Sequence, residues 1–279
     1  MKKKISLQTL VEPSAEGGAQ GVSSLHENDT DRLLCVVLDI GEHMLRNGGE
    51  VHRVEDTMER VCRAYGVAHV EVFVITSLLM AAIRMPDGSY SSQIRRVYGV
   101  SKDLSKIEEF NRISRRICQE KPSFDDVEKW IYQAKRVKPY SSFFAVAGSA
   151  LMSGAFCVFF GGNARDGIAA TIVGMLIGIL GYFTGKKANV MAKAIVESFF
   201  LALFSIISVA VGLGENIQYV TIGAIMLVIP GLDFGNSLRD LMYGNLISGV
   251  LRMLQSVVTA VIIALGYLAA MFLLGGVLQ

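Results

Sequence analysis

The sequence predicts an α+β cytoplasmic domain followed by an all-α membrane bundle of about five transmembrane helices. Charge divides the 279 residues near Tyr140: only six of the 27 Lys and Arg residues, and five of the 25 Asp and Glu residues, follow Pro139. The second part contains uncharged apolar runs long enough to cross a hydrocarbon core of ~30 Å. The first part shows helical and then strand spacing of its apolar residues, as a domain with its own core does.

The N-terminal elements follow in order from these spacings. Residues 1–29 are rich in Gly, Ser, Glu and Gln, which predicts a disordered tail. The cytoplasmic domain occupies 30–139 and begins with two amphipathic helices between Asp31 and Tyr65, separated at Gly48-Gly49. Strands are predicted at 69–77, 78–85 and 89–97, the last two joined by a turn at 86–88. Helices at 103–119 and after Ser123, which forms a capping box with Asp126, complete the domain.

The membrane domain occupies 140–279, with spans predicted at about 141–162, 167–185, 194–214, 216–232 and 253–277. Lys and Arg near span ends are retained on the cytoplasmic side. With the N-terminus inside, only Arg165 lies in an outer loop, so we expect a cytoplasmic N-terminus and an outside C-terminus. The basic residues of the inner flanks are Lys135, Arg136, Lys138, Lys186, Lys187, Lys193, Arg239 and Arg252.

Small residues recur in the first two spans at spacings that let helix backbones approach. Ala150 with Gly154, and Gly174 with Gly178, are each four residues apart. These pairs predict tight helix packing, within this chain or with another.

The fourth predicted span is short and closes with Pro230 and Gly231. In transporters, segments broken by Pro or Gly often mark the binding site, because freed backbone groups can hold ions and carboxylates. The alternative is an ordinary cytoplasmic loop with a helix cap. On the first interpretation, the candidate substrate- or ion-binding residues near the permeation route are Asp233, Asn236, Ser237, Arg239 and Asp240.

Glu197 is a further candidate, because it is the acidic residue of an otherwise apolar run. It could face the bundle interior as a proton or ammonium site. It could instead reach back to Lys193 one turn earlier, and the spacing of four residues favours this pairing.

Several functional classes find no support. The first part balances 21 basic against 20 acidic residues, so nucleic acid is an unexpected partner. His43 and His52 lack the spacing of a helical zinc site, and we interpret them as part of a solvated, charged helix face. No phosphate-binding loop or nucleophile elbow is present, so we predict no catalytic residues, no metal and no cofactor.

Two segments carry a family resemblance: residues 49–57 (GEVHRVEDT), and Pro230-Gly231 followed by residues 236–241 (NSLRDL). Together they resemble the threonine/serine exporter family. The resemblance implies a bacterial inner-membrane exporter of small hydrophilic metabolites, driven by the proton gradient. It also implies a split member, whose partner is a second small membrane subunit; a homo-oligomer is a further possibility. The motif residues without an assigned role are Gly49, Glu50, Arg53, Glu55, Pro230 and Gly231.

The leading hypothesis is therefore export of threonine or serine by proton antiport. A zwitterion needs one cationic and one anionic partner, which Arg239 with Asp233 or Asp240 could supply. Asp240 or Asp233 would carry the coupling charge, and Arg239 would bind the substrate carboxylate or form a cytoplasmic gate. The alternatives are a dicarboxylate (succinate) exporter component, a membrane-anchored ligand-sensing protein, and a membrane-bound hydrolase using the face of Glu50, His52 and Glu55.

Overall fold

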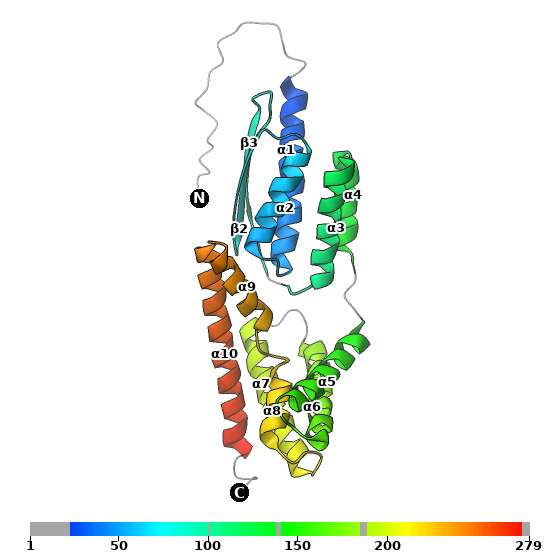
Figure 1. Cartoon of the computed structure of the whole chain (residues 1–279), viewed down its shortest axis with the longest axis vertical. Coiled ribbons are helices and arrows are strands. Elements are labelled where there is room, and N and C mark those ends of the chain that lie inside the picture. The colour runs from blue at the N-terminus through cyan, green and yellow to red at the C-terminus, as the bar shows by residue number, and fades with distance from the viewer. Residues whose placement is uncertain (1–22, 100, 138–140, 185–188, 275–279) are drawn as a thin grey trace, which may run out of the picture.

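The computed structural model describes residues 23–99, 101–137, 141–184 and 189–274, which form two domains stacked end to end (Figure 1). The N-terminal domain contains four helices and a three-stranded sheet, and the membrane domain is helical. Each domain has its own cluster of buried apolar side chains. The first cluster ends at Ala134 and the second begins at Cys157, while the predicted boundary at Tyr140 lies outside the described residues.

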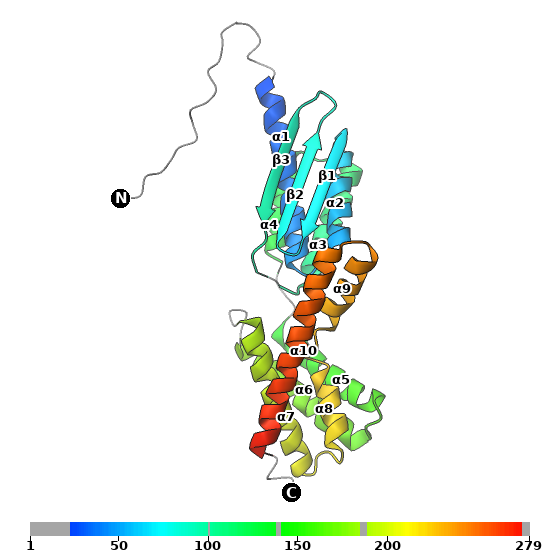
Figure 2. The same ribbon diagram turned by 90° about the vertical axis from the view of Figure 1, so that its left-hand side faces the viewer.

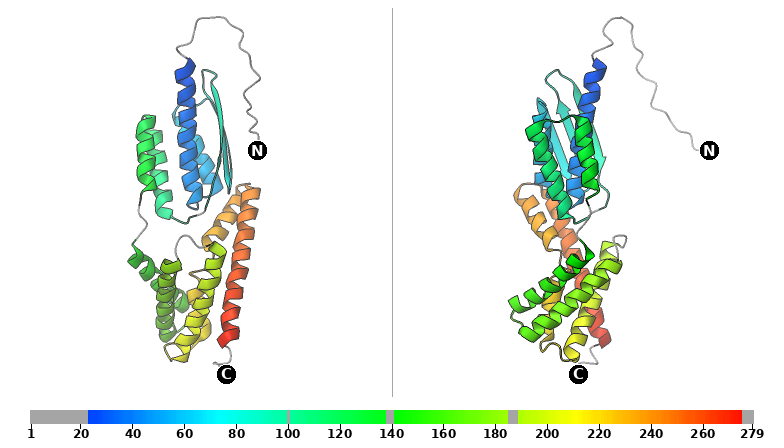
Figure 3. Two further views of the ribbon diagram at one scale, coloured as in Figure 1. Left: turned by 180° about the vertical axis from the view of Figure 1, so that it is seen from behind. Right: turned by 90° about the vertical axis from the view of Figure 1, so that its right-hand side faces the viewer.

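The N-terminal domain has three layers: the sheet, then α1 (Ser23–Arg46) and α2 (Val51–Ala64), then α3 (Leu104–Glu120) and α4 (Phe124–Lys135). Figure 3 shows this order from behind. Helix α2 packs on one face of the sheet because it is amphipathic, with Val51, Val54, Met58 and Val61 buried. Helix α1 lies beside it and is buried on several sides, since it contacts the sheet and also α3 and α4. The other face of the sheet is directed outward in Figure 2.

The sheet is antiparallel in the order β1 (His69–Ile75), β2 (Leu78–Arg84), β3 (Tyr90–Arg96). The turn before β3 contains Gly88 at φ +91°, as predicted for this hairpin. The capping box is also confirmed, since Ser123 accepts a hydrogen bond from the Asp126 amide. Helix α1 begins at Ser23, earlier than expected, and the remaining predicted tail, 1–22, lies outside the described residues.

In the described part of the membrane domain, four helices are long and apolar enough to span a membrane: α5 (Ser142–Phe159), α6 (Ala164–Thr184), α7 (Val190–Ala210) and α10 (Leu246–Leu274). The predicted count of five is not confirmed. The segment at 216–232 is not one continuous helix, because α8 (Ile217–Ile225) ends after nine residues, a rise of only ~13 Å. Pro230 explains the break, since it would leave the Met226 carbonyl without its helical donor.

After the break, α9 (Gly231–Met242) carries the chain to the N-terminal domain, and α10 returns along α7 to the far end of the membrane domain (Figure 1). Helix α10 has 29 residues, or ~44 Å, so it is longer than a hydrocarbon core of ~30 Å. The helix is therefore long enough for its first turns, which with α9 contact the N-terminal domain, to lie outside the hydrocarbon core. This arrangement brings the polar stretch after Pro230 against the N-terminal domain.

The predicted close packing of the first two spans is confirmed. A Cβ atom on Gly174 would lie 2.5 Å from Ser153 Cβ and 2.7 Å from the Ser149 carbonyl oxygen. One on Gly154 would overlap Thr171. Glycine at these positions lets α5 and α6 approach to backbone contact.

Candidate functional site

The first contact between the domains is made by a buried carboxylate. Asp240 of α9 has no exposed surface, and its Oδ1 atom accepts a hydrogen bond of 3.0 Å from the amide of Val51, the first residue of α2. The N-cap residue Glu50 makes no capping bond with its own side chain. Asp240 therefore satisfies a free N–H at the start of α2 and places a negative charge at the positive end of its helix dipole. The membrane domain thus supplies the N-terminal cap of helix α2 in the N-terminal domain.

Arg252 of α10 closes the same contact. Its guanidinium lies 3.5 Å from Asp240 Oδ2 and donates a 2.9 Å hydrogen bond to the Gly49 carbonyl oxygen. Its side chain is only 12% exposed. A buried pair of this kind is costly to break, because removing one partner leaves the other charge uncompensated.

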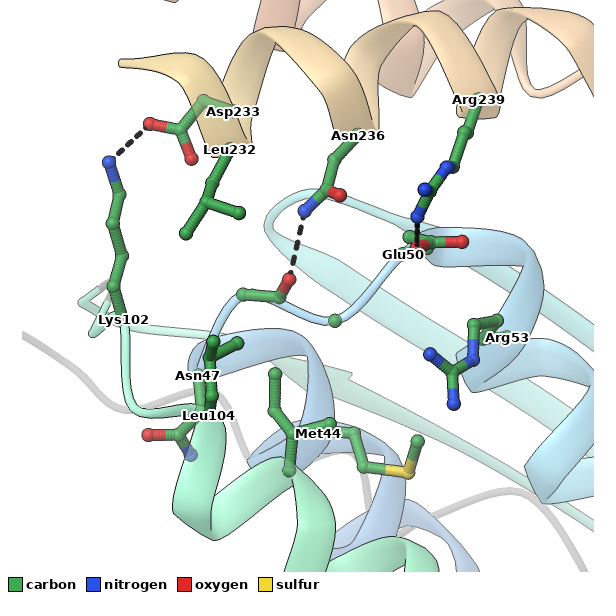
Figure 4. Close-up of a pocket in the computed structure, with 13 residues that line it drawn as sticks. Met44, Asn47, Glu50, Arg53, Lys102, Leu104, Leu232, Asp233, Asn236 and Arg239 are labelled. Atoms are coloured by element: carbon green, nitrogen blue, oxygen red, sulfur yellow. Dashed lines mark hydrogen bonds and ion pairs between the residues drawn. The ribbon is translucent and has the colours of Figure 1, made fainter. Parts of the chain in front are cut away.

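One face of α9 makes three further contacts with the N-terminal domain, shown in Figure 4. Asp233 pairs with Lys102 at 2.5 Å, and the Asn236 amide donates to the Gly48 carbonyl at 3.1 Å. Arg239 pairs with Glu50 at 2.5 Å. Residues 233, 236 and 239 are spaced by one helical turn, which is why they share this face.

The start of α2 also contacts the turn after α9. His52 stacks on Tyr243 with ring centroids 4.2 Å apart. Glu55 accepts a 2.9 Å hydrogen bond from the Val74 amide of β1 and is also bonded by the Asn245 side chain. His52 is exposed, in agreement with the predicted solvated face, although its ring makes this contact. His43 is half-buried and stacks on Phe110 at 5.0 Å, so the prediction of a solvated side chain is wrong for it.

A cavity of about 190 Å³ lies between the α1–α2 turn, the segment before α3 and the face of α9. Two ion pairs lie at the ends of the cavity, Lys102–Asp233 at one and Glu50–Arg239 at the other (Figure 4). Its lining residues are Met44, Asn47, Gly48, Gly49, Glu50, Arg53, Lys102, Leu104, Ile107, Leu232, Asp233, Asn236 and Arg239.

Burial shapes the acid–base properties of the junction. It raises the pKa of Asp240 above its usual range, although the Arg252 charge and the Val51 amide act in the opposite direction. Burial likewise raises the pKa of Glu55 against its bonds from Val74 and Asn245. Both carboxyl groups therefore hold a proton more readily than they would in water.

The two sequence segments that meet at this junction are those that carry the family resemblance. The threonine/serine exporter family model matches residues 35–274, which include both domains and the junction. The chain belongs to this family.

Three relatives support the same relation. A protein of Mycobacterium tuberculosis named "Probable threonine/serine exporter" is 22% identical over 235 residues, covering 84% of this chain and 44% of the relative. An uncharacterised protein of Schizosaccharomyces pombe is 21% identical, covering 87% of this chain and 30% of the relative. A Debaryomyces hansenii protein named "Pheromone-regulated membrane protein 10" is 22% identical, with shares of 86% and 26%.

The chain spans less than half the length of these relatives. No solved structure matches it. The family is one of exporters, which is a transport class and not an enzyme class.

Most of the candidate residues of this threonine/serine exporter family member lie together at the junction: Asp233, Asn236, Arg239 and Asp240 from α9, with Gly49, Glu50 and Arg53 from the other domain. Ser237 is buried beside them and donates to the Phe234 carbonyl. Pro230 and Gly231 lie at the start of α9. Glu197 is elsewhere, on α7, where it lies 3.4 Å from Lys193, so the predicted pairing is confirmed.

Sequence reasoning missed Asp166, at the opposite end of the membrane domain. Its carboxylate is fully buried and accepts bonds from the amides of Glu215 (2.7 Å), Asn216 (2.8 Å) and Asn163 (3.2 Å). These bonds tie the α5–α6 turn to the α7–α8 turn. A conspicuous signal was present, since Asp166 lies between two apolar runs and near Asn163.

Proposed function

We propose that this chain is a component of an inner-membrane exporter of small hydrophilic metabolites, most specifically threonine and serine, and works with a second small membrane subunit. The observation that carries the proposal is family membership over residues 35–274. The M. tuberculosis relative named as a threonine/serine exporter supports the substrate class. The N-terminal domain lies on the cytoplasmic side in this proposal, in agreement with the basic residues of the inner flanks.

If export is driven by proton antiport, Asp240 is the residue that carries the coupling charge. This carboxyl group is buried, its pKa is raised by burial, and it contacts α2 and α10 at once. Protonation would weaken the bond that Asp240 accepts from the Val51 amide and remove its attraction for Arg252, which itself bonds the Gly49 carbonyl. Both changes would loosen the hold of α9 on the N-terminal domain. Because α9 directly follows the break at Pro230, a change in its position would reach the short helix α8 among α5, α6 and α7.

The test is efflux from cells loaded with a threonine-containing dipeptide. Export is expected when this chain and its partner subunit are produced together, and not with either alone. Asp240→Asn keeps an oxygen that can accept from the Val51 amide but does not titrate, so we expect insertion without proton-coupled export. If Asp240→Asn exported at the parental rate under an imposed pH gradient, the proposed role of Asp240 in proton coupling would be rejected. If no combination exported threonine or serine, the substrate assignment would be lost.

A further inference from the structure

One cationic side chain of the junction cavity has no charged partner among the residues that the structure describes. Three of its lining residues are cationic, and two of these, Lys102 and Arg239, are paired with Asp233 and Glu50. The third, Arg53, makes no hydrogen bond or ion pair with any residue that the structure describes. Its guanidinium group is therefore available to an anion.

The remaining lining defines the size and chemistry of what fits. The volume of about 190 Å³ is smaller than pockets for drug-sized ligands, which are ~300–1,000 Å³. At ~30 Å³ per water molecule it corresponds to about six waters. One side is apolar, formed by Met44, Leu104, Ile107 and Leu232. The amide oxygen of Asn236 makes no hydrogen bond among the described residues, while its nitrogen bonds Gly48, so this oxygen can accept from an ammonium or hydroxyl group.

We propose that this cavity binds a small solute with a single carboxylate, which pairs with Arg53 while Asn236 receives its donor group. An Arg guanidinium suits this role because it can bond both carboxylate oxygens at once. A dicarboxylate would place its second charge near Glu50 and Asp233, which disfavours that class. The choice of an amino acid as the natural ligand rests on the proposed function; the carboxylate class rests on the cavity.

Because the cavity lies between the two domains, a bound ligand affects how firmly they dock. Arg53 belongs to the N-terminal domain and Asn236 to α9, so a ligand held by both side chains joins the two domains. Ligand binding and docking of α9 then reinforce each other by the same factor.

The experiment is titration calorimetry on the full chain purified in detergent, with L-threonine, L-threoninol, succinate and inorganic phosphate as probes. L-Threonine should bind saturably, and L-threoninol, which lacks the carboxylate, should bind at least tenfold more weakly. Arg53→Gln should weaken threonine binding at least tenfold. The matched control is Arg115→Gln on α3, which changes another exposed helical arginine that makes no ion pair among the described residues and should leave binding unchanged.

A second variant separates binding from folding. Arg53→Lys keeps the positive charge but cannot bond both carboxylate oxygens at once, so it should bind threonine more weakly than the parent and more tightly than Arg53→Gln. A folding defect would abolish binding by both variants alike. Absence of saturable threonine binding, or binding unaffected by Arg53→Gln, would overturn the site. Equal or tighter binding of succinate or phosphate would overturn the single-carboxylate class. Export without binding would reject this site alone, and binding without export would reject the proposed function alone.

Discussion

At the scale of single residues, two carboxylates without exposed surface join segments that are distant in sequence. Asp166 ties two turns at one end of the membrane domain through backbone amides. Asp240 joins the two domains and also has a charged neighbour, Arg252. The difference matters because a carboxylate held by amides is structural, whereas one balanced against a single guanidinium can change partners when it is protonated.

Removing the Asp240 carboxylate should undock α9. Asp240→Ala leaves Arg252 buried without its counter-charge and Val51 without its acceptor, which costs about 3–5 kcal/mol of docking free energy. Hydrogen exchange at the Val51 amide should accelerate about a hundredfold or more. Asp240→Asn keeps the acceptor and should retain much of the protection. Equal exchange in the parent and the Ala variant would show that this contact does not hold the junction.

The stability of the N-terminal domain should fall at mildly acid pH because of His43. Burial lowers the pKa of His43 from 6.5 to about 4, with a smaller contribution from Lys135. The unfolded chain therefore binds the proton first, and stability is lost as pH falls from about 6.5 towards 4. With partial exposure of the ring taken into account, we expect a loss of about 1–3 kcal/mol over this window.

Trp130, the single tryptophan of the chain, lies on α4 and reports urea unfolding of this domain by fluorescence. The comparison variant is His43→Phe, which keeps a ring to stack on Phe110 but cannot titrate. The difference in unfolding free energy between the parent and this variant should change with pH between 6.5 and 4. A constant difference would contradict the assignment of the effect to His43.

At the scale of elements, the sequence predicts helices and strands well wherever apolar spacing is regular. The helices on either side of Gly48-Gly49, the hairpin at Gly88 and the Ser123 cap all follow from local chemistry. The stretch after Pro230 could not be decided between loop and helix, because its two buried side chains, Ser237 and Asp240, are polar. Their burial depends on the other domain and on α10, which local periodicity does not reveal.

Helix contact between α5 and α6 gives an element-scale prediction. Gly174→Ala places a methyl group against Ser153 and the Ser149 carbonyl, so the two helices must separate, at a cost of about 1–3 kcal/mol. The matched control is Gly148→Ala on α5, where nothing lies within 4 Å of the new methyl group. The temperature of thermal inactivation in detergent should fall for Gly174→Ala only. Equal shifts would mean that the loss reflects glycine content and not contact.

At the scale of the whole molecule, two separate apolar cores meet through a polar junction. None of the buried apolar residues in either core cluster belongs to the other domain. Polar interdomain contacts are weaker and more easily reversed than a shared core. Composition predicts the two domains, and the family resemblance identifies both segments of the junction. The contact between these segments could not be predicted, because they are about 180 residues apart. Either segment could have made its contacts within its own domain.

The Glu50–Arg239 pair tests whether the junction links the domains as a unit. Glu50→Arg and Arg239→Glu each oppose like charges across the cavity end, so each should loosen docking and lower export. The double variant restores opposite charges, and its docking should recover relative to either single variant by about 1 kcal/mol, the range for a partly exposed pair. Recovery should be incomplete, because an arginine at position 50 lies at the positive end of α2.

Docking in these variants is measured by hydrogen exchange at the Val51 amide, and export by efflux from dipeptide-loaded cells. The same exchange of charges at the Arg165–Glu215 pair, at the far end of the membrane domain, serves as the control and should leave Val51 unaffected. If docking and export recover together in the double variant, the N-terminal domain acts on transport through α9. If docking recovers while export does not, Glu50 or Arg239 has a second role that depends on its own charge, such as holding the solute. If neither recovers, the pair does not connect the domains, and the other contacts of α9 and α10 with the N-terminal domain, made by Asp233, Asn236, Asp240 and Arg252, must carry that connection.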